Sequence, residues 1–144
     1  MIMNNHFGIV LPSLKIGGGN RVLLQFSKLA IANQNKCTIF FLNRVGKNFT
    51  FPHSRAISQK VFGDNIFTIF FSSILLSLKI RYDSRINTLI ISDPILLIFS
   101  FIYSQKKIIR FVQSNDYLLF DQNKKGNHIL NWAYKRLFRM SQKY

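Results

Sequence analysis

Three consecutive glycines are the residues whose type and spacing most directly suggest chemistry. Gly17, Gly18 and Gly19 follow an apolar run at residues 7–11 and a short polar stretch, and a segment with helical periodicity begins at Asn20. Glycines let a backbone approach a phosphate closely, and the unpaired N–H groups of a first helical turn can then bind it. The pattern predicts an anion-binding turn, although a tight turn without a ligand would have the same sequence.

This glycine turn differs from two common nucleotide-binding motifs. Val22 stands where G-x-G-x-x-G would have its third glycine, and no Gly-Lys-Ser/Thr sequence follows as a P-loop requires. Arg21 lies one turn into the expected helix, where it could support a bound phosphate or simply face solvent. The sequence therefore leaves both a ligand-binding turn and a purely structural turn open.

The chain is strongly basic. Its 144 residues include 20 Lys and Arg but only 5 acidic residues, all of them Asp, so the formal net charge is +15. Such a field attracts anions, whether nucleotide phosphates, nucleic acid or an anionic membrane surface. An AT-rich genome would explain part of the Lys, Asn, Ile and Phe content but not the lack of Glu. An anionic partner is therefore expected.

Composition and hydropathy favour one folded domain without a membrane span. Hydrophobic residues make up 48% of the chain and charged residues 17%, as in globular proteins. The apolar stretch at 66–78 is too short to span a bilayer, and Asp93-Pro94 interrupts the one at 86–103. Cys37, the single cysteine, is expected to be buried and inert, which suits a reducing compartment. Since residues 1–6 show no signal-peptide pattern, a cytoplasmic location is expected.

Strands and helices are expected to alternate along the chain. Short apolar runs predict strands at 7–11, 37–42, 88–92 and 107–112, and a weaker run predicts an edge strand at 56–62. Helical spacing predicts helices at 20–32, from an Asp64 or Asn65 cap to 78, from an Asp93 cap to 103, and at 127–144. Residues 43–52 and 113–126 are expected to be loops. This alternation is typical of a Rossmann-like α/β domain, a parallel sheet with helices on both faces.

The order of elements resembles the opening of family 4 glycosyltransferases of the GT-B fold. The matching residues lie in the glycine turn and first helix: Gly17, Gly18, Gly19, Arg21, Val22, Leu23, Leu24 and Leu29. The strand at 36–42 fits the next element of that family. Residues 106–117 resemble the strand that ends in Gln and leads to an acidic residue in bacterial rhamnosyltransferase-like members. The resemblance covers nearly the whole chain, and its specific motifs are the glycine turn and the Val112-Gln113 strand end.

The resemblance implies roles for particular side chains. The three glycines and Arg21 would contact the diphosphate of a nucleotide-sugar donor, which is a substrate rather than a cofactor. Asp116 follows a predicted strand end, where open α/β sheets bind ligands, and would take the proton of an acceptor hydroxyl. It could equally cap the local backbone. Gln113 is a candidate acceptor contact, and His53 is the best placed of three scattered histidines, although simple exposure explains its loop position better.

The lack of Glu bears directly on this resemblance. In the family, a second domain with two glutamates eight positions apart holds most of the donor, and this chain contains no Glu. Residues 1–144 would therefore be the N-terminal, acceptor-binding half of an enzyme of cell-envelope polysaccharide synthesis, with the donor-binding half encoded separately or lost. The last expected helix combines Trp132 with basic residues, so it could attach to anionic lipid or form an ordinary solvated face.

Two other classes of function remain open. A small nucleic-acid-binding protein would explain the +15 charge, but the basic residues are spread along the chain and no recognition motif is present. A non-catalytic partner subunit of a transferase would have the same fold. The expected partners are a nucleotide sugar, a glycan or lipid-linked acceptor, a separately encoded half and the inner face of the cytoplasmic membrane, with no nucleic acid and no metal.

Overall fold

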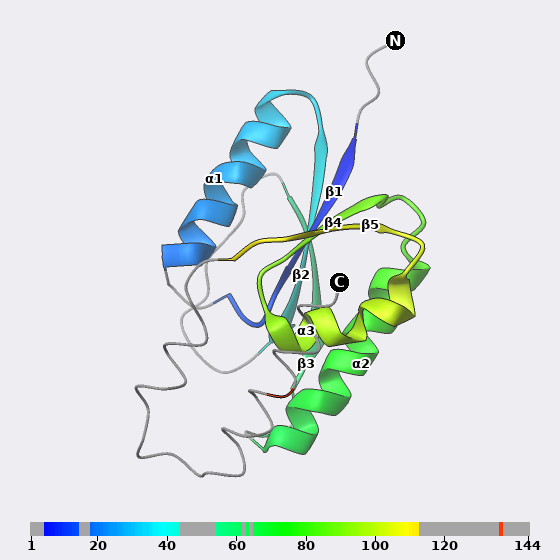
Figure 1. Ribbon diagram of the computed structural model, residues 1–144. Helices are drawn as coiled ribbons and strands as arrows, with labels where there is room; N and C mark the ends of the chain where they lie inside the picture. The colour runs from blue at the N-terminus through cyan, green and yellow to red at the C-terminus, as the bar shows by residue number, and fades with distance from the viewer. Residues whose placement is uncertain are drawn as a thin grey trace.

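The computed structural model describes residues 5–14, 18–43, 54–61, 63, 65–112 and 136. Within these residues, five strands form one sheet in the order β3-β2-β1-β4-β5, and every neighbouring pair is parallel (Figure 1). The strands are β1 (His6–Leu11), β2 (Lys36–Asn43), β3 (Arg55–Lys60), β4 (Thr88–Ile91) and β5 (Lys107–Arg110). The helices are α1 (Gly18–Ala32), α2 (Ile66–Tyr82) and α3 (Pro94–Ile98), followed by a 3-10 helix, η1 (Phe99–Tyr103). The fold is Rossmann-like, as the alternation of elements predicted.

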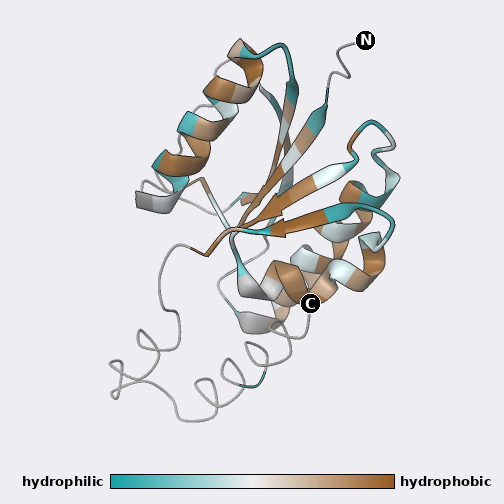
Figure 2. Ribbon diagram, turned by 45° about the horizontal axis from the view of Figure 1, so that its top comes forward, coloured by the Kyte–Doolittle hydropathy of each residue, from teal (hydrophilic) through white to brown (hydrophobic). Residues whose placement is uncertain are grey.

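Helices cover both faces of the sheet, which is why its central strands are continuously apolar. Alternate residues of a strand point to opposite faces. On one face, Ile9 and Ile39 pack with Leu23 of α1. On the other, Val10 and Phe40 belong to a cluster with residues of α2, α3 and η1. Figure 2 shows the hydrophobic colouring running through the central strands, between helices on either side.

Gly8 lies at a point of close approach in β1. A Cβ atom added there would lie 2.6 Å from Leu89 Cδ2 and 3.1 Å from Ile86 Cγ2. Both neighbours are buried, so neither can move away without disturbing the core. The glycine therefore allows β4 and the segment before it to pack closely on the centre of the sheet.

The second helix is apolar over most of its circumference. Its residues Leu76 and Ile80 are fully buried, whereas its residues Phe67 and Phe71 are 83% and 61% exposed. Its buried Ser73 and Ser77 hydroxyls donate to carbonyls four residues earlier, Ile69 O and Ser73 O, at 2.8 Å each. These bonds satisfy the two hydroxyls without another element, so the helix can bury serines among leucines and isoleucines.

Several predicted boundaries differ from those observed. The second helix continues beyond residue 78 to Tyr82, because Lys79 Nζ and Arg81 Nη1 donate to Ser58 O and Ile102 O at 2.8 and 3.2 Å and so tie the extra turn to other elements. The helix expected at 94–103 is divided into α3 and η1. At this division the Leu96 carbonyl accepts a 2.6 Å bond from the buried Tyr103 hydroxyl. The last strand ends at Arg110 rather than residue 112.

Of the predicted helix caps, one makes a side-chain capping bond and another does not. Asp93 Oδ1 accepts a bond from Leu96 N at 3.0 Å and confirms the cap of α3. Asn65 is the N-cap residue of α2, but its side chain makes no capping bond, and its carbonyl instead accepts one from Thr68 Oγ1 at 2.7 Å. Asp64, the loops at 44–52 and 113–126, and all of the final predicted helix except the helical Arg136 lie outside the described residues.

Candidate functional site

A change in chain direction between β1 and β4 defines the candidate site. The chain leaves β1 for α1 on one face of the sheet and leaves β4 for α3 on the other face (Figure 1). Neighbouring strands that diverge in this way leave a crevice outside their carboxyl ends, where open α/β proteins bind ligands. We call this end of the sheet the carboxyl edge.

The start of α1 forms one side of this crevice. Gly18 and Gly19 are its first two residues, and Arg21 lies in the same turn with its side chain exposed. Asn20 Nδ2 donates to Ser13 O at 3.1 Å, which ties the first turn of the helix to the segment that follows β1. The structure places Gly18, Gly19 and Arg21 in the first turn of α1, and their contact with a phosphate stays a prediction, while Gly17 lies outside the described residues.

The segment after β4 forms the other side. Ser92 N donates to Val10 O at 3.4 Å, so this segment stays attached to β1 just beyond the end of β4. The half-buried Asp93 follows, and its carboxylate caps α3. Burial raises the pKa of the Tyr103 phenol, and the nearby Asp93 charge adds to the shift, so the hydroxyl remains a donor to Leu96 O. The sequence indicated Asp93 only as a cap, and the strand order is what places it at the crevice.

The residues predicted to contact an acceptor cannot be placed. His53, Gln113 and Asp116 lie outside the described residues, so their roles stay predictions. The described chain does reach the carboxyl edge after β5, because Phe111 N donates to Ile91 O at 2.9 Å. Residue 112, the last described residue before Gln113 and Asp116, therefore lies just beyond the carboxyl edge.

A second group of polar residues lies at the opposite end of the sheet, the amino edge. Four of the five strands begin with a basic residue or histidine, namely His6, Lys36, Arg55 and Lys107, and Arg85 precedes the fifth. The parallel register places His6 beside Lys36 and Thr38 beside Arg55. These residues are far apart in the sequence. The only signal that could have found them is the repeated basic residue at predicted strand starts.

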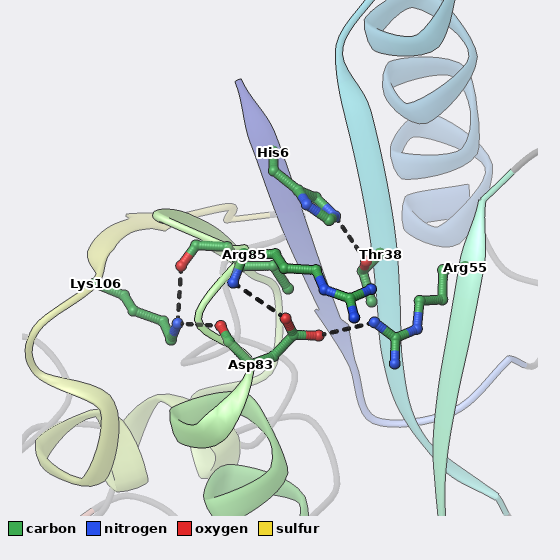
Figure 3. Close-up of polar contacts among 7 residues, drawn as sticks. His6, Thr38, Arg55, Asp83, Arg85 and Lys106 are labelled. Atoms are coloured by element: carbon green, nitrogen blue, oxygen red, sulfur yellow. Dashed lines mark hydrogen bonds and ion pairs between the residues drawn. The ribbon is translucent and has the colours of Figure 1, made fainter. Parts of the chain in front are cut away.

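Hydrogen bonds organise this amino-edge group around one acidic residue (Figure 3). Asp83 follows α2, and its carboxylate accepts bonds from Arg55 Nη1 at 3.4 Å and from Arg85 N at 3.3 Å. Lys106 Nζ donates to the carbonyls of Asp83 and Ile86 at 2.8 Å each, which fixes the turn that carries Arg85. Burial lowers the pKa of Lys106, and the Asp83 charge opposes that shift.

His6 completes the group on the side of β1. Its Nε2 and Thr38 Oγ1 form a hydrogen bond of 2.8 Å. Burial lowers the pKa of the imidazole; Asp83 opposes this, while Lys36, Arg85 and Arg55 lower it further. The neutral ring is therefore favoured near pH 7.

Two hollows adjoin this group. One of about 620 Å³ is lined by His6, Ile31, Asn35, Lys36, Cys37, Thr38, Arg55 and Arg85. The other, of about 600 Å³, lies along α2 and β3 and shares Arg55 and Arg85 with the first. Cys37 is buried, as predicted, and burial raises the pKa of its thiol to about 11, so it is not a thiolate nucleophile.

Other features that often reveal a function contribute little. Within the described ranges, no three His, Cys or Asp side chains are placed to hold a metal ion, and no helix has the length and apolar character to cross a membrane. The strand order and the two edges of the sheet are therefore the features that bear on function. Comparison with models of protein families gives no match, and comparison with curated protein sequences gives none either.

Proposed function

We propose that this chain is the acceptor-side domain of a two-domain glycosyltransferase. Its reaction would transfer a sugar from a nucleotide sugar to a cell-envelope glycan or a lipid-linked acceptor. The observation that carries the proposal is the strand order, in which the connections after β1 and β4 leave for opposite faces of the sheet, with the glycine-containing start of α1 beside that point. The resemblance of the glycine turn and of residues 106–117 to family 4 glycosyltransferases supplies the reaction.

The start of α1 offers what a donor diphosphate requires. The first backbone N–H groups of a helix have no partner within the helix, and the helix dipole favours an anion at that end. Gly18 and Gly19 carry no side chain that would keep a phosphate away from these groups. The exposed guanidinium of Arg21 adds positive charge on the same turn. The diphosphate would contact this turn, and the second domain of the enzyme would hold most of the nucleotide.

The chemical step needs a base for the acceptor hydroxyl. The hydroxyl oxygen would form a bond to the anomeric carbon while the bond to the diphosphate breaks, and the nucleoside diphosphate would leave with that electron pair. Asp116 would take the hydroxyl proton, and Gln113 and His53 would position the acceptor. These three roles rest on the family resemblance alone.

An acceptor carried by a lipid would place the enzyme at the cytoplasmic membrane surface. Phe67, Phe70 and Phe71 share one face of α2, and all three are exposed. Phe99 bridges Phe70 to the exposed Phe101 of η1, with ring centroids 4.9 and 6.4 Å apart. An exposed aromatic surface on a chain with a formal charge of +15 is suited to an anionic bilayer.

The test is a reconstituted transfer assay. The chain would be co-produced with a candidate donor-binding half that carries the paired glutamates, and transfer of labelled sugar to lipid acceptors would be measured in anionic and in neutral vesicles. Gly18→Asp should lower turnover by about 100-fold, because it places a carboxylate against the donor diphosphate. Gln25→Asp, at an exposed position in the middle of the same helix, makes the matched charge change and should leave turnover near wild type.

Two results would contradict the proposal. One is unchanged turnover in a folded Gly18→Asp enzyme. The other is a stable complex of the two halves that transfers sugar from none of the common nucleotide sugars. Circular dichroism and thermal unfolding of each variant would separate loss of function from loss of fold.

A further inference from the structure

The amino-edge hollow of about 620 Å³ collects basic side chains from separate elements. Lys36 comes from the start of β2, Arg55 from the start of β3, and Arg85 from the turn before β4. We propose that this hollow binds the phosphoryl group of a phosphorylated small molecule. The site is independent of the glycosyltransferase proposal, because it lies at the opposite end of the strands, roughly 20 Å away for a six-residue strand.

The charges around the hollow do not balance. Lys36, Arg55 and Arg85 line it, and among the described residues the carboxylate that acts on this group is that of Asp83. The Asp83 side chain is only 9% exposed and is already bonded to Arg55 and to a backbone N–H. One carboxylate can neutralise one of the three cations, so within the part of the chain that the structure describes two positive charges remain.

The two arginines also approach one another. Figure 3 shows the Arg85 side chain extending toward Thr38 and Arg55. Within the described residues, neither the Arg85 guanidinium nor the Lys36 ammonium has a hydrogen-bond or ion-pair partner. Like charges held close together repel unless an anion lies between them. A bound phosphate dianion would supply that charge.

The polar groups of the hollow match the donors that phosphate prefers. Guanidinium groups bind phosphate oxygens through paired N–H donors, and an ammonium adds a point charge. The Thr38 hydroxyl and the His6 imidazole, already joined to each other, lie at the same end of the sheet. Burial is the main cause of the lowered pKa of His6; Asp83 opposes the shift, and Lys36, Arg85 and Arg55 lower the pKa further.

The size and the apolar part of the hollow indicate more than an inorganic ion. A volume of about 620 Å³ is in the range of small-molecule sites and well above that of one phosphate. Ile31 and Cys37 form an apolar wall beside the basic residues. The phosphoryl group would bind the cations, and the organic part of the ligand would lie against this wall.

Binding would be measured by calorimetry on the full chain at physiological salt. The probes are inorganic pyrophosphate, ribose 5-phosphate, and phosphatidylcholine vesicles with or without phosphatidic acid. Saturable binding of the soluble probes would support a small-molecule ligand, whereas binding of the phosphatidic acid vesicles alone, weakened by Arg85→Gln, would overturn it in favour of a lipid headgroup. Amide NMR shifts at Thr38 and Arg55 would locate the ligand.

Variants make the test specific. Arg85→Gln should weaken pyrophosphate binding at least about tenfold, as expected for loss of a charged hydrogen-bond donor. Lys28→Gln, on the exposed surface of α1, makes the same charge change outside the hollow and should have little effect. Because the Arg85 guanidinium has no partner among the described residues, its loss should not unfold the chain.

Three further results would overturn the proposal. They are the absence of saturable binding of every probe by the wild-type chain, an equal loss of affinity in Arg85→Gln and Lys28→Gln, and NMR shifts confined to Gly18 and Gly19. The last would assign the anion to the start of α1 and so would support the donor-diphosphate proposal instead.

Discussion

The two edges of the sheet offer anions different chemistry. At the carboxyl edge, the available groups are mainly backbone N–H groups at the start of α1, beside glycines. At the amino edge they are side chains, with Arg55, Arg85 and Lys36 around a hollow. A site made of backbone N–H groups should lose anion affinity when a substitution adds a side chain to a glycine. A site made of charged side chains should lose affinity when a substitution removes one of the charges. The same fold can therefore carry two anion sites that respond to different mutations.

The largest expected effect comes from β1, the central strand that runs from one edge to the other. Gly8→Val would place branched carbons where even a Cβ lies 2.6 Å from Leu89 Cδ2, so we expect a loss of about 2–3 kcal/mol in the free energy of unfolding. Urea unfolding followed by circular dichroism would measure it. Ala56→Val, an enlargement of an exposed residue on β3, is the matched control and should change stability little. A Gly8→Val chain as stable as wild type would contradict the close packing of Leu89 and Ile86 against Gly8.

A smaller effect on stability should distinguish α3 and η1, which follow β4, from β2 and β3. Tyr103→Phe removes the hydroxyl that donates to the buried Leu96 carbonyl at 2.6 Å, and an unpaired buried carbonyl costs about 1–2 kcal/mol. Hydrogen exchange should then increase in α3 and η1 more than in β2 and β3. Tyr82→Phe removes the same hydroxyl from a residue that is 78% exposed, and it should have no such effect. Equal behaviour of the two variants would contradict the structural role of the Tyr103 bond.

The smallest effect concerns pH and the amino edge. The pKa of His6 is lowered from 6.5 in the folded chain, chiefly by burial, so the unfolded chain binds the proton more readily. The contribution of His6 to stability is therefore complete above 6.5 and is lost as the pH falls from there toward the lowered folded value. His6→Gln should reduce the slope of stability against pH in this window.

An NMR titration of the imidazole would test the same point directly. We expect a pKa below 6.5 in the free chain, and an upward shift when pyrophosphate is added, because an anion in the hollow would favour the protonated ring. A value above 6.5 without added anion would contradict the lowering that burial chiefly causes and that Lys36, Arg85 and Arg55 increase.

Local patterns predicted the fold well, and contacts between distant residues account for what they missed. The strands could be recognised because both faces of the sheet are covered, so β2 is buried at every position from 37 to 42 and is apolar at all of these but Thr38. The end of α2 was wrong by four residues, because Lys79 and Arg81 are held by carbonyls of β3 and η1 that no local pattern reveals. The glycine turn was found because its residues are consecutive. The amino-edge group was not, because only the strand register brings His6, Lys36 and Arg55 together.

The Lys106 ammonium group has a consequence for the order in which the molecule is assembled. It bonds the carbonyls of Asp83 and Ile86, and so holds the turn that carries Arg85. Every residue given above as lining the amino-edge hollow is made earlier in synthesis than this lysine. We therefore expect the first four strands to pair on a nascent chain while the turn remains unfixed, and the hollow to take its final shape only when Lys106 has left the ribosome.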